Sequence, residues 1–319
     1  MQDLDTNMAI QMQDVNKHYP HFDLKNINLQ LPKGSIMGFI GPNGAGKSTT
    51  IRILMGLVHQ DSGDVHVLGQ PMPKGQVAAK WDIGFASEDM RLYKNETIEW
   101  HMNYMKSIFE SWDPSYAKTL VKRFDLTTQQ KVKGLSHGQR VKAGLLLMLA
   151  RKPKLLLLDE PTTGLDPVAR HEVLNELMDV LLDEERSILF SSHNTQDVEQ
   201  LSDEITFIDK GSIISSENKE SYLEKWRRIR LEFTKDKPLP ALAGVVEQRR
   251  VGNQAIITAK SFNDNMAETY KNCGAQIHAI ENMTLEEIFV SEVQSSRATR
   301  EHGGRSDSNQ SQSDQGAAA

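Results

Sequence analysis

The sequence predicts an α/β protein built on a parallel sheet that helices cover on both faces. Three short, nearly continuous apolar runs are typical of strands buried on both faces: SIMGFI at 35–40, KLLLLD at 154–159 and SILFSS at 187–192. Segments with apolar residues three and four positions apart separate these runs. Strands that alternate with helices favour a parallel sheet.

The N-terminal part of the chain predicts an antiparallel layer, the start of the parallel sheet and a helical insert. Residues 9–20 and 22–31 alternate apolar and polar side chains, as half-buried antiparallel strands do. A glycine-rich loop follows the strand at 35–40, and the residues after it have helical spacing. The other elements expected here are strands at 62–70 and 81–89 and a helical insert at about 90–135, interrupted at 112–114.

The remaining sequence continues the alternation and then begins a second, smaller pattern. After residue 135 we expect a helix at about 137–151, a strand at 154–159, a helix at about 167–184, a strand at 187–192, a short helix at about 195–201 and strands at 204–209 and 212–217. From about 229, strands at 228–234, 254–260 and 275–280 and helices at 263–273 and 284–294 indicate a small α+β unit.

The composition changes again near the C-terminus. Beyond about 296 the chain is rich in Ser, Gln, Asp and Gly, has almost no apolar residues, and is expected to be disordered because it cannot offset its ordering entropy. We therefore predict three regions: a first domain at 1–228 containing the insert, a small α+β domain at 229–295 and a disordered tail at 296–319.

The composition also excludes several classes of protein. The net charge of the 319 residues is -6 and the two signs are interspersed, which disfavours nucleic-acid binding. No apolar run approaches the roughly 18–20 residues that a membrane helix needs, and the N-terminal segment has no signal-peptide pattern. The single cysteine, Cys273, cannot form an intrachain disulfide, which fits a reducing compartment.

The segment GPNGAGKST at 41–49 matches the phosphate-loop pattern, with a strand before it and a helix after it. Its glycines let backbone N–H groups approach a phosphate, and the helix N-terminus adds a favourable dipole. Lys47 would place its charge on the β- and γ-phosphates, and Ser48 would offer an oxygen to Mg²⁺. The predicted ATP-binding residues of this loop are Gly41, Asn43, Gly44, Ala45, Gly46, Lys47, Ser48 and Thr49.

Polar residues follow two other predicted strands. Asp159 ends the run at 154–159 and Glu160 follows it directly. Asp159 could bind Mg²⁺, and Glu160 could polarise an attacking water. His193 follows the strand at 187–192, where it could contact a γ-phosphate or that water. The carboxyl ends of parallel strands meet at one sheet edge, so these side chains are expected near the phosphate loop.

The order of these motifs resembles the nucleotide-binding subunits of ATP-binding cassette (ABC) transporters. Phosphate loop, LSHGQ at 135–139, LLLLDE, TTGLDP and His193 follow one another over roughly residues 8–225. LSHGQ is similar to the signature LSGGQ of the family, in which two domains lie head to tail and each signature closes over the other's nucleotide. The resemblance implies that Ser136, Gly138 and Gln139 bind the γ-phosphate of ATP on a second subunit, most simply another copy of this chain.

Further roles follow from the same resemblance. Asp166 lies in the loop that follows Glu160, the glutamate at the family's catalytic position. Tyr19 lies where the family stacks an aromatic ring on adenine. Tyr19 could instead be a strand-edge residue that packs on the sheet, and His18 and Phe22 are alternative candidates for the stacking ring.

Two positions depart from the family pattern. His137 replaces a signature glycine, with a possible change in packing against the partner, and Glu88 replaces a metal-linking glutamine.

The resemblance implies an ATPase that drives a separate membrane-spanning subunit, as an exporter, from the cytoplasmic face of the membrane. Phe109, Trp112 and Tyr93 of the insert could contact that subunit or could form the insert's own core. The alternative is a soluble ABC protein acting on ribosomes, on DNA or as a regulator. One cassette, no basic stripe and no sustained heptads argue against the ribosomal and DNA-associated classes.

Overall fold

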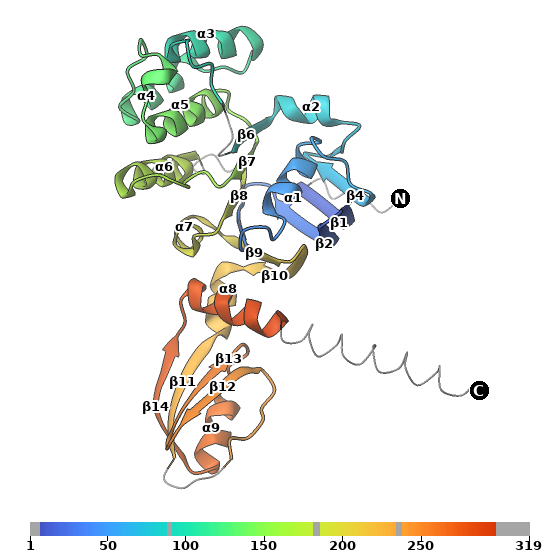
Figure 1. The fold of residues 1–319 in the computed structure, drawn as a ribbon, viewed down its shortest axis with the longest axis vertical. Coiled ribbons are helices and arrows are strands. Elements are labelled where there is room, and N and C mark those ends of the chain that lie inside the picture. Colours follow the sequence, from blue (N-terminus) through green and yellow to red (C-terminus); the bar gives the residue numbers. More distant parts are fainter. Residues whose placement is uncertain (1–6, 88–90, 181–185, 234–237, 298–319) are drawn as a thin grey trace, which may run out of the picture. The chain divides into compact units, whose positions relative to one another are not determined.

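The computed structural model describes residues 7–87, 91–180, 186–233 and 238–297. It divides into two compact units, Met1–Ser216 and Glu217–Ala319, each of which is described by itself. Figure 1 shows the ribbon of both units. Among the described helices, none is long and apolar enough to cross a lipid bilayer.

A six-stranded sheet forms the centre of the first unit. Its strand order is β10-β9-β3-β8-β7-β6, and the pairs β3 with β8, β3 with β9, β7 with β8 and β6 with β7 are parallel. The strands are β3 (Ile36–Ile40), β6 (Ile83–Ser87), β7 (Leu155–Asp159), β8 (Ser187–Ser192), β9 (Glu204–Asp209) and β10 (Ser212–Asn218). Every residue of β3, β7 and β8 is buried, which explains their continuous apolar runs and confirms the α/β prediction.

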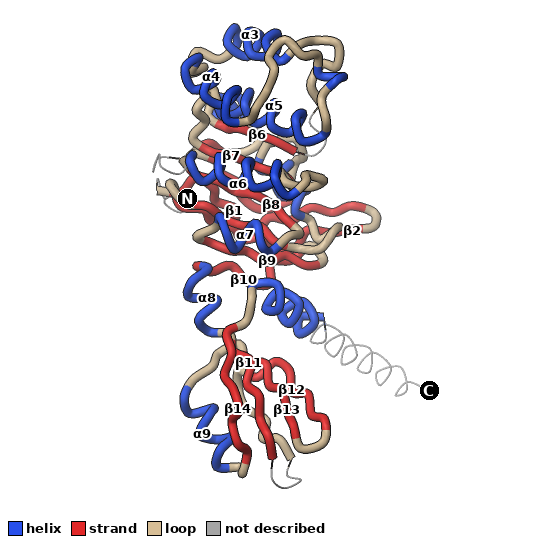
Figure 2. Tube along the Cα trace, turned by 90° about the vertical axis from the view of Figure 1, so that its left-hand side faces the viewer, coloured by secondary structure: helices blue, strands red, loops and turns tan. Residues whose placement is uncertain are grey.

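Helices and a second sheet cover the two faces of this sheet. Helices α6 (Pro167–Val180) and α7 (Thr195–Leu201) lie on one face, and α1 (Lys47–Leu54) lies on the other beneath a four-stranded sheet (Figures 1 and 2). That second sheet has the order β2-β1-β4-β5, and the pairs β1 with β2, β1 with β4 and β4 with β5 are antiparallel. Its strands are β1 (Met8–Tyr19), β2 (Phe22–Pro32), β4 (Ser62–Val67) and β5 (Gln70–Pro71).

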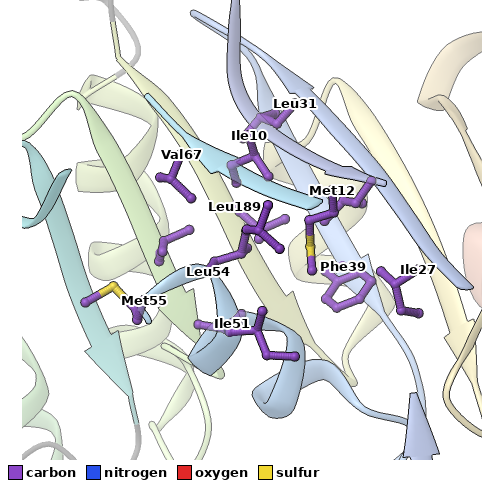
Figure 3. Packing of buried hydrophobic residues seen from close by; sticks show 14 of the residues in the cluster. Ile10, Met12, Ile27, Leu31, Phe39, Ile51, Leu54, Met55, Val67 and Leu189 are labelled. Carbon is purple, nitrogen blue, oxygen red and sulfur yellow. The ribbon is translucent and has the colours of Figure 1, made fainter. Parts of the chain in front are cut away.

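The main hydrophobic core fills the space between the two sheets. Ile10 and Met12 of β1 face Ile51 and Leu54 of α1, and Leu189 of β8 closes the same cluster from the central sheet (Figure 3). All five side chains are buried, so this core fixes α1, and with it the loop that precedes α1, against the sheet.

The predicted insert consists of short helices with clear start signals. Thr97 caps α3 (Ile98–Ile108) by accepting a hydrogen bond from the backbone N–H of Trp100, and Asp113 caps α4 (Pro114–Arg123). This explains the interruption at 112–114, because Asp followed by Pro favours a new helix start. The other helices of this unit are α2 (Gln76–Trp81), the 3₁₀ turn at Val132–Gly134 and α5 (His137–Leu149).

The second unit is a four-stranded sheet with a helix packed on it. The sheet has the order β12-β13-β11-β14, and α9 (Asp264–Asn272) contributes Met266 and Tyr270 to its core. The strands are β11 (Arg227–Phe233), β12 (Val245–Val251), β13 (Gln254–Ala259) and β14 (Ala275–Asn282); α8 (Lys219–Lys225) precedes them and residues 285–297 are helical. The sequence did not predict β12, because none of the residues of this edge strand is buried and it lacks apolar alternation.

The turn between β9 and β10 ties the antiparallel sheet to the loop before α1. Gly211 in this turn accepts a hydrogen bond from the N–H of Lys25 at 2.7 Å and donates its own N–H to the carbonyl of Ala45 at 2.9 Å. Its φ is +75°, and a β-carbon built on it would lie 1.7 Å from the carbonyl oxygen of Asp23. A side chain at this position would therefore separate the two sheets.

We predict that Gly211→Ala destabilises the chain much more than Gly69→Ala does. Both glycines have positive φ (+75° and +77°), so each alanine costs about 1–2 kcal/mol of backbone strain. Only Gly211 has backbone in contact range, which adds roughly 1–3 kcal/mol. Urea unfolding of the two variants measures the difference, and equal losses would contradict the role of this turn.

Candidate nucleotide site

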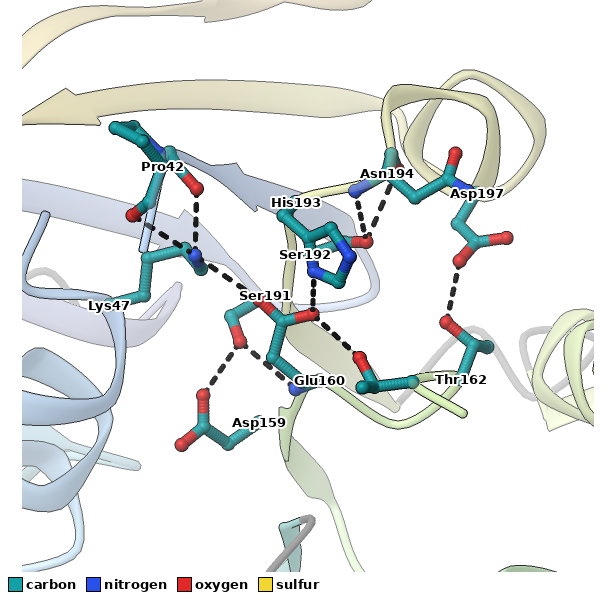
Figure 4. Close-up of polar contacts among 12 residues, drawn as sticks. Pro42, Lys47, Asp159, Glu160, Thr162, Ser191, Ser192, His193, Asn194 and Asp197 are labelled. Atoms are coloured by element: carbon teal, nitrogen blue, oxygen red, sulfur yellow. Dashed lines mark hydrogen bonds and ion pairs between the residues drawn. The ribbon is translucent and has the colours of Figure 1, made fainter. Parts of the chain in front are cut away.

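Three neighbouring strands of the central sheet end together and supply the site. Ile40 at the end of β3 is in register with Ser192 of β8, and Asp159 at the end of β7 is in register with Ser191. The residues that follow these ends are the phosphate loop, Glu160 and His193. The structure thus brings the sequence-predicted residues of three motifs to one sheet edge (Figure 4).

The phosphate loop wraps tightly between β3 and α1. Gly46 precedes α1 with φ +115°, and a β-carbon there would lie 2.5 Å from Leu24 and 3.0 Å from Phe22 of the antiparallel sheet. Lys47, the first residue of α1, is buried, and its Nζ donates to the carbonyl of Gly41 at 2.7 Å. The loop therefore curls around its own lysine at a helix N-terminus, an arrangement that favours anions.

The other residues of the loop differ in exposure. Gly41, Ala45 and Gly46 are buried, Ser48 and Thr49 are partly buried, and Asn43 and Gly44 are exposed. The small side chains of the buried residues allow the backbone of the loop to approach the sheet. Ser48 and Thr49 lie in the first turn of α1. Ser48 directly follows the buried Lys47 in the first turn of α1.

Glu160 is the centre of the polar contacts at the sheet edge. Its Oε1 lies 3.1 Å from the Nζ of Lys47, and its Oε2 lies 2.7 Å from the Nδ1 of His193 and accepts from the hydroxyl of Thr163 at 3.0 Å (Figure 4). The residue has φ +55°, a left-handed conformation that costs about 1–2 kcal/mol for a residue with a side chain. These contacts hold the carboxylate in place despite that strain.

The surroundings keep the Glu160 carboxyl ionised. Burial raises its pKa, but the charge and hydrogen bond of Lys47 and those of His193 lower it more, so the net pKa lies below the ordinary value of 4.5. An ionised carboxylate is the form that accepts a hydrogen bond from water and can polarise it.

Asp159 is oriented by a residue that the sequence analysis did not single out. The buried hydroxyl of Ser191 donates to Oδ1 of Asp159 at 2.7 Å and accepts from the backbone N–H of Glu160 at 3.0 Å. Among the residues that the structure describes, no group of three or more His, Cys, Asp or Glu side chains is arranged so that it could hold a metal ion by itself. One carboxylate with the hydroxyl of Ser48 fits Mg²⁺, which typically takes one or two protein carboxylates together with substrate phosphates.

A second buried carboxylate fixes the loop after Glu160. Asp197 of α7 is 1% exposed, accepts from the hydroxyl of Thr162 at 2.6 Å and pairs with Arg170 of α6 at 2.6 Å. No spacing in the sequence signals this contact, because Asp197 and Thr162 lie on separate elements. Its effect is to hold the 161–166 loop against the helix that follows His193.

The signature residues lie at the start of α5. Ser136 accepts from the N–H of Gln139 at 3.1 Å, and Gln139 accepts from the N–H of Ser136 at 2.9 Å, which forms a capping box. Gly138 is partly buried, and Ser136 is exposed. The helix start is therefore well defined and open to solvent at Ser136. The ring of His137 turns to its own chain, with Nε2 at 3.1 Å from the carbonyl of Thr163.

The structure describes two of the three remaining sequence-predicted residues, Tyr19 and Asp166. The Tyr19 ring lies 6.5 Å from the ring of Phe22, which itself approaches Gly46 of the phosphate loop. Asp166 caps the start of α6 by accepting from the N–H groups of Val168 and Ala169, and these bonds lower its pKa. Glu88 lies outside the described residues.

The fold and the site define an α/β protein that binds a nucleoside triphosphate through a phosphate loop. The ABC transporter family model matches residues 24–163. ABC transporter ATP-binding protein YtrB of Bacillus subtilis is 31% identical over 67% of this chain and 73% of its own length. The lantibiotic transport ATP-binding protein SrtF of Streptococcus pyogenes is 36% identical over 64% of this chain and 89% of its own length.

Solved structures agree with these matches. A solved ATP-binding subunit of an ABC transporter covers 68% of this chain and 92% of its own length, with a TM-score of 0.62 and 22% identity, which supports the fold alone. CbiO1 of Clostridium perfringens covers 69% and 92% of the two chains, with a TM-score of 0.59 and 25% identity. The chain belongs to the ABC transporter family, and it is an ATP-binding, ATP-hydrolysing subunit.

We predict that Ser191→Ala disturbs the carboxylate of Asp159, the predicted Mg²⁺ ligand, and that Ser192→Ala does not. Both serines are buried and each loses a hydrogen bond, so each variant lowers the free energy of unfolding by about 1–3 kcal/mol. Only Ser191 contacts Asp159, so only its loss raises the Mg²⁺ concentration needed for half-maximal ATPase activity. Equal Mg²⁺ dependence in the two variants would contradict this role.

The depressed pKa of Glu160 predicts a pH-dependent contribution to stability. A carboxyl with a lowered folded-state pKa stabilises the chain above its unfolded value of 4.5, and this contribution is lost as the pH falls through the folded-state pKa. The difference in unfolding free energy between wild type and Glu160→Gln should therefore shrink from about pH 7 to about pH 3. Denaturant titrations at several pH values measure this difference in unfolding free energy. A difference that does not change with pH would contradict the lowered pKa of Glu160.

Proposed function

We propose that this chain is the ATPase of an exporter and drives a separate membrane-spanning subunit through ATP-dependent closure of two copies. The observation that carries the proposal is the cluster of Lys47, Glu160 and His193 at one sheet edge, in a chain that also carries one exposed signature helix start. Relatives named for lantibiotic transport, linearmycin resistance and Nod factor export support the exporter assignment.

Each residue of the site has a proposed part in binding ATP. Tyr19 stacks on adenine, and the phosphate-loop backbone with Lys47 holds the phosphates. Ser48 and Asp159 would hold Mg²⁺, which when bound neutralises phosphate charge, and Glu88 is proposed to lie beside it. Ser136 at the start of α5 is exposed, which supports the proposal that Ser136, Gly138 and Gln139 bind the γ-phosphate of a second copy. Asp166 is proposed to lie at the same interface.

The hydrolytic step follows from the contacts of Glu160. Its ionised carboxylate accepts a hydrogen bond from the attacking water and draws the proton away as the oxygen approaches the γ-phosphate. His193 binds the same carboxylate at 2.7 Å, so it orients Glu160 and lies where it can contact the phosphate. Closure is a population shift, because ATP between two copies contacts the closed state more extensively than the open one.

The helical insert offers a surface for the membrane-spanning subunit. Trp112 is buried at 8% exposure and Phe109 is partly buried under the guanidinium of Arg151, so these two residues belong to the packed interior. Tyr93 is 63% exposed and packs edge-on against Trp100, which stacks on Tyr104. We propose that these exposed rings contact the membrane-spanning subunit and that the chain lies at the cytoplasmic face of the membrane.

The second compact unit is proposed to be a separate domain that stabilises the pair of copies. Its own core of Ile229, Leu231, Ile257 and Tyr270 supports an independent fold. The alternative of a soluble ABC protein acting on ribosomes or DNA has less support, since the relatives cited above are named for transport or resistance.

We predict that Glu160→Gln, isolated from detergent-solubilised native membranes with ATP and Mg²⁺, retains a membrane-spanning protein and forms a stable dimer. The variant keeps the residues that bind ATP but loses the charge that polarises water, so hydrolysis falls at least about 100-fold. Lys47→Ala is the control, because it removes the phosphate contact and should form no ATP-dependent dimer. Recovery of soluble partners, ribosomes or DNA alone would overturn the exporter proposal.

A further inference from the structure

The ring of His137 binds the loop that carries the catalytic carboxylate in the same chain. His137 is the first residue of α5, and the capping box of Ser136 and Gln139 fixes the direction in which its side chain leaves the helix. Its Nε2 lies 3.1 Å from the carbonyl oxygen of Thr163. A carbonyl only accepts, so Nε2 carries the hydrogen and donates it.

A second hydrogen bond continues from Thr163 to the site. The Thr163 hydroxyl donates to Oε2 of Glu160 at 3.0 Å, the same oxygen that lies 2.7 Å from Nδ1 of His193. One residue, Thr163, therefore accepts from the signature helix through its carbonyl and donates to Glu160 through its side chain. Two hydrogen bonds separate the start of α5 from the carboxylate that polarises water.

His137 is exposed, but its ring lies close to the loop. Gly164 has φ +73°, and a β-carbon built on it would lie 3.1 Å from Nε2 of His137. A cavity of about 80 Å³, lined in part by His137, Thr163 and Glu160, lies beside these contacts. It has room for a few water molecules, so without the ring water could replace it at the carbonyl of Thr163. A glycine at position 137 would have no group to make this bond.

We propose that His137 is a positioning residue for ATP hydrolysis, which acts through Thr163 to orient Glu160 of its own chain. The start of α5 is also where the proposed partner's ATP would bind, so contact there is transmitted to hydrolysis in the same chain through His137 and Thr163. The proposal rests on the proposed role of Glu160 and is independent of the membrane-spanning subunit.

The first test is the ATPase activity of the purified full-length chain. His137→Ala should lower kcat about threefold to tenfold with little change in KM, as expected for one lost orienting hydrogen bond. His137→Gln, which keeps a donor, should restore most of kcat. Thr163→Val should lower kcat similarly, and the double variant should lose less than the product of the two single losses. An unchanged kcat in His137→Ala, or losses that multiply, would overturn the proposal.

The second test does not depend on activity. Amide hydrogen exchange at residues 161–166 of the chain without nucleotide should be about threefold to tenfold faster in His137→Ala than in wild type. His171→Ala is the matched control, since His171 is an exposed histidine of α6 bonded to Asn175 and should change neither exchange nor kcat. Unchanged exchange in His137→Ala would overturn the proposal even if the chain proved inactive.

The third test separates positioning from direct contact with the second copy. In the Glu160→Gln background, ATP-dependent dimer formation measured by analytical ultracentrifugation should be the same with His137 or with Ala at position 137. A weaker dimer would show that the ring acts on the second copy and would refute the proposal. If Glu160→Gln instead hydrolyses ATP at the wild-type rate, the assigned role of Glu160 is wrong, and faster exchange at 161–166 would still report the contact of His137.

Discussion

The ion pair between Lys47 and Glu160 is the interaction on which the geometry of the site depends. It joins the first residue of α1 to the residue that follows β7, and both side chains are largely withdrawn from water. Removal of either partner would leave a charge uncompensated in this environment, which is costly. The pair therefore connects the phosphate loop to the end of β7 and lowers the pKa of Glu160. It also helps to offset the strain of the left-handed backbone at Glu160.

Hydroxyl groups orient three carboxylates at or near the site through hydrogen bonds. Ser191 donates to Asp159, Thr162 donates to Asp197, and Thr163 donates to Glu160. A hydroxyl supplies a directional donor but no charge, and each carboxylate keeps further acceptor sites for other partners. Ser191 and Thr162 belong to different elements from their carboxylates, so their two bonds also stabilise the packing of β7, β8, α7 and the 161–166 loop. Thr163 and Glu160 belong to the same turn.

The sequence predicted which residues meet at the sheet edge where residue type and the ends of strands determine this. It did not predict the contacts that depend on the direction of a side chain. Lys47, Glu160 and His193 each come directly after a buried strand or its loop, so their meeting at one edge follows from the parallel sheet. Ser191 and the inward turn of His137 depend on rotamers and on the packing of separate elements, which no spacing rule contains. The sequence predicts that His137 affects packing against a second copy, which stays a prediction, and it did not predict the bond of His137 within the chain.

The turn at Gly211 has a consequence for how the nucleotide site forms. Its backbone joins β2 through Lys25 and the phosphate loop through Ala45, and Phe22 of the same sheet touches Gly46. These contacts tie the sheet that carries Tyr19 to the phosphate loop. In the proposed function, the distance between the base-stacking ring and the phosphates is therefore set within one chain. This half of the nucleotide site is then formed before a second copy closes.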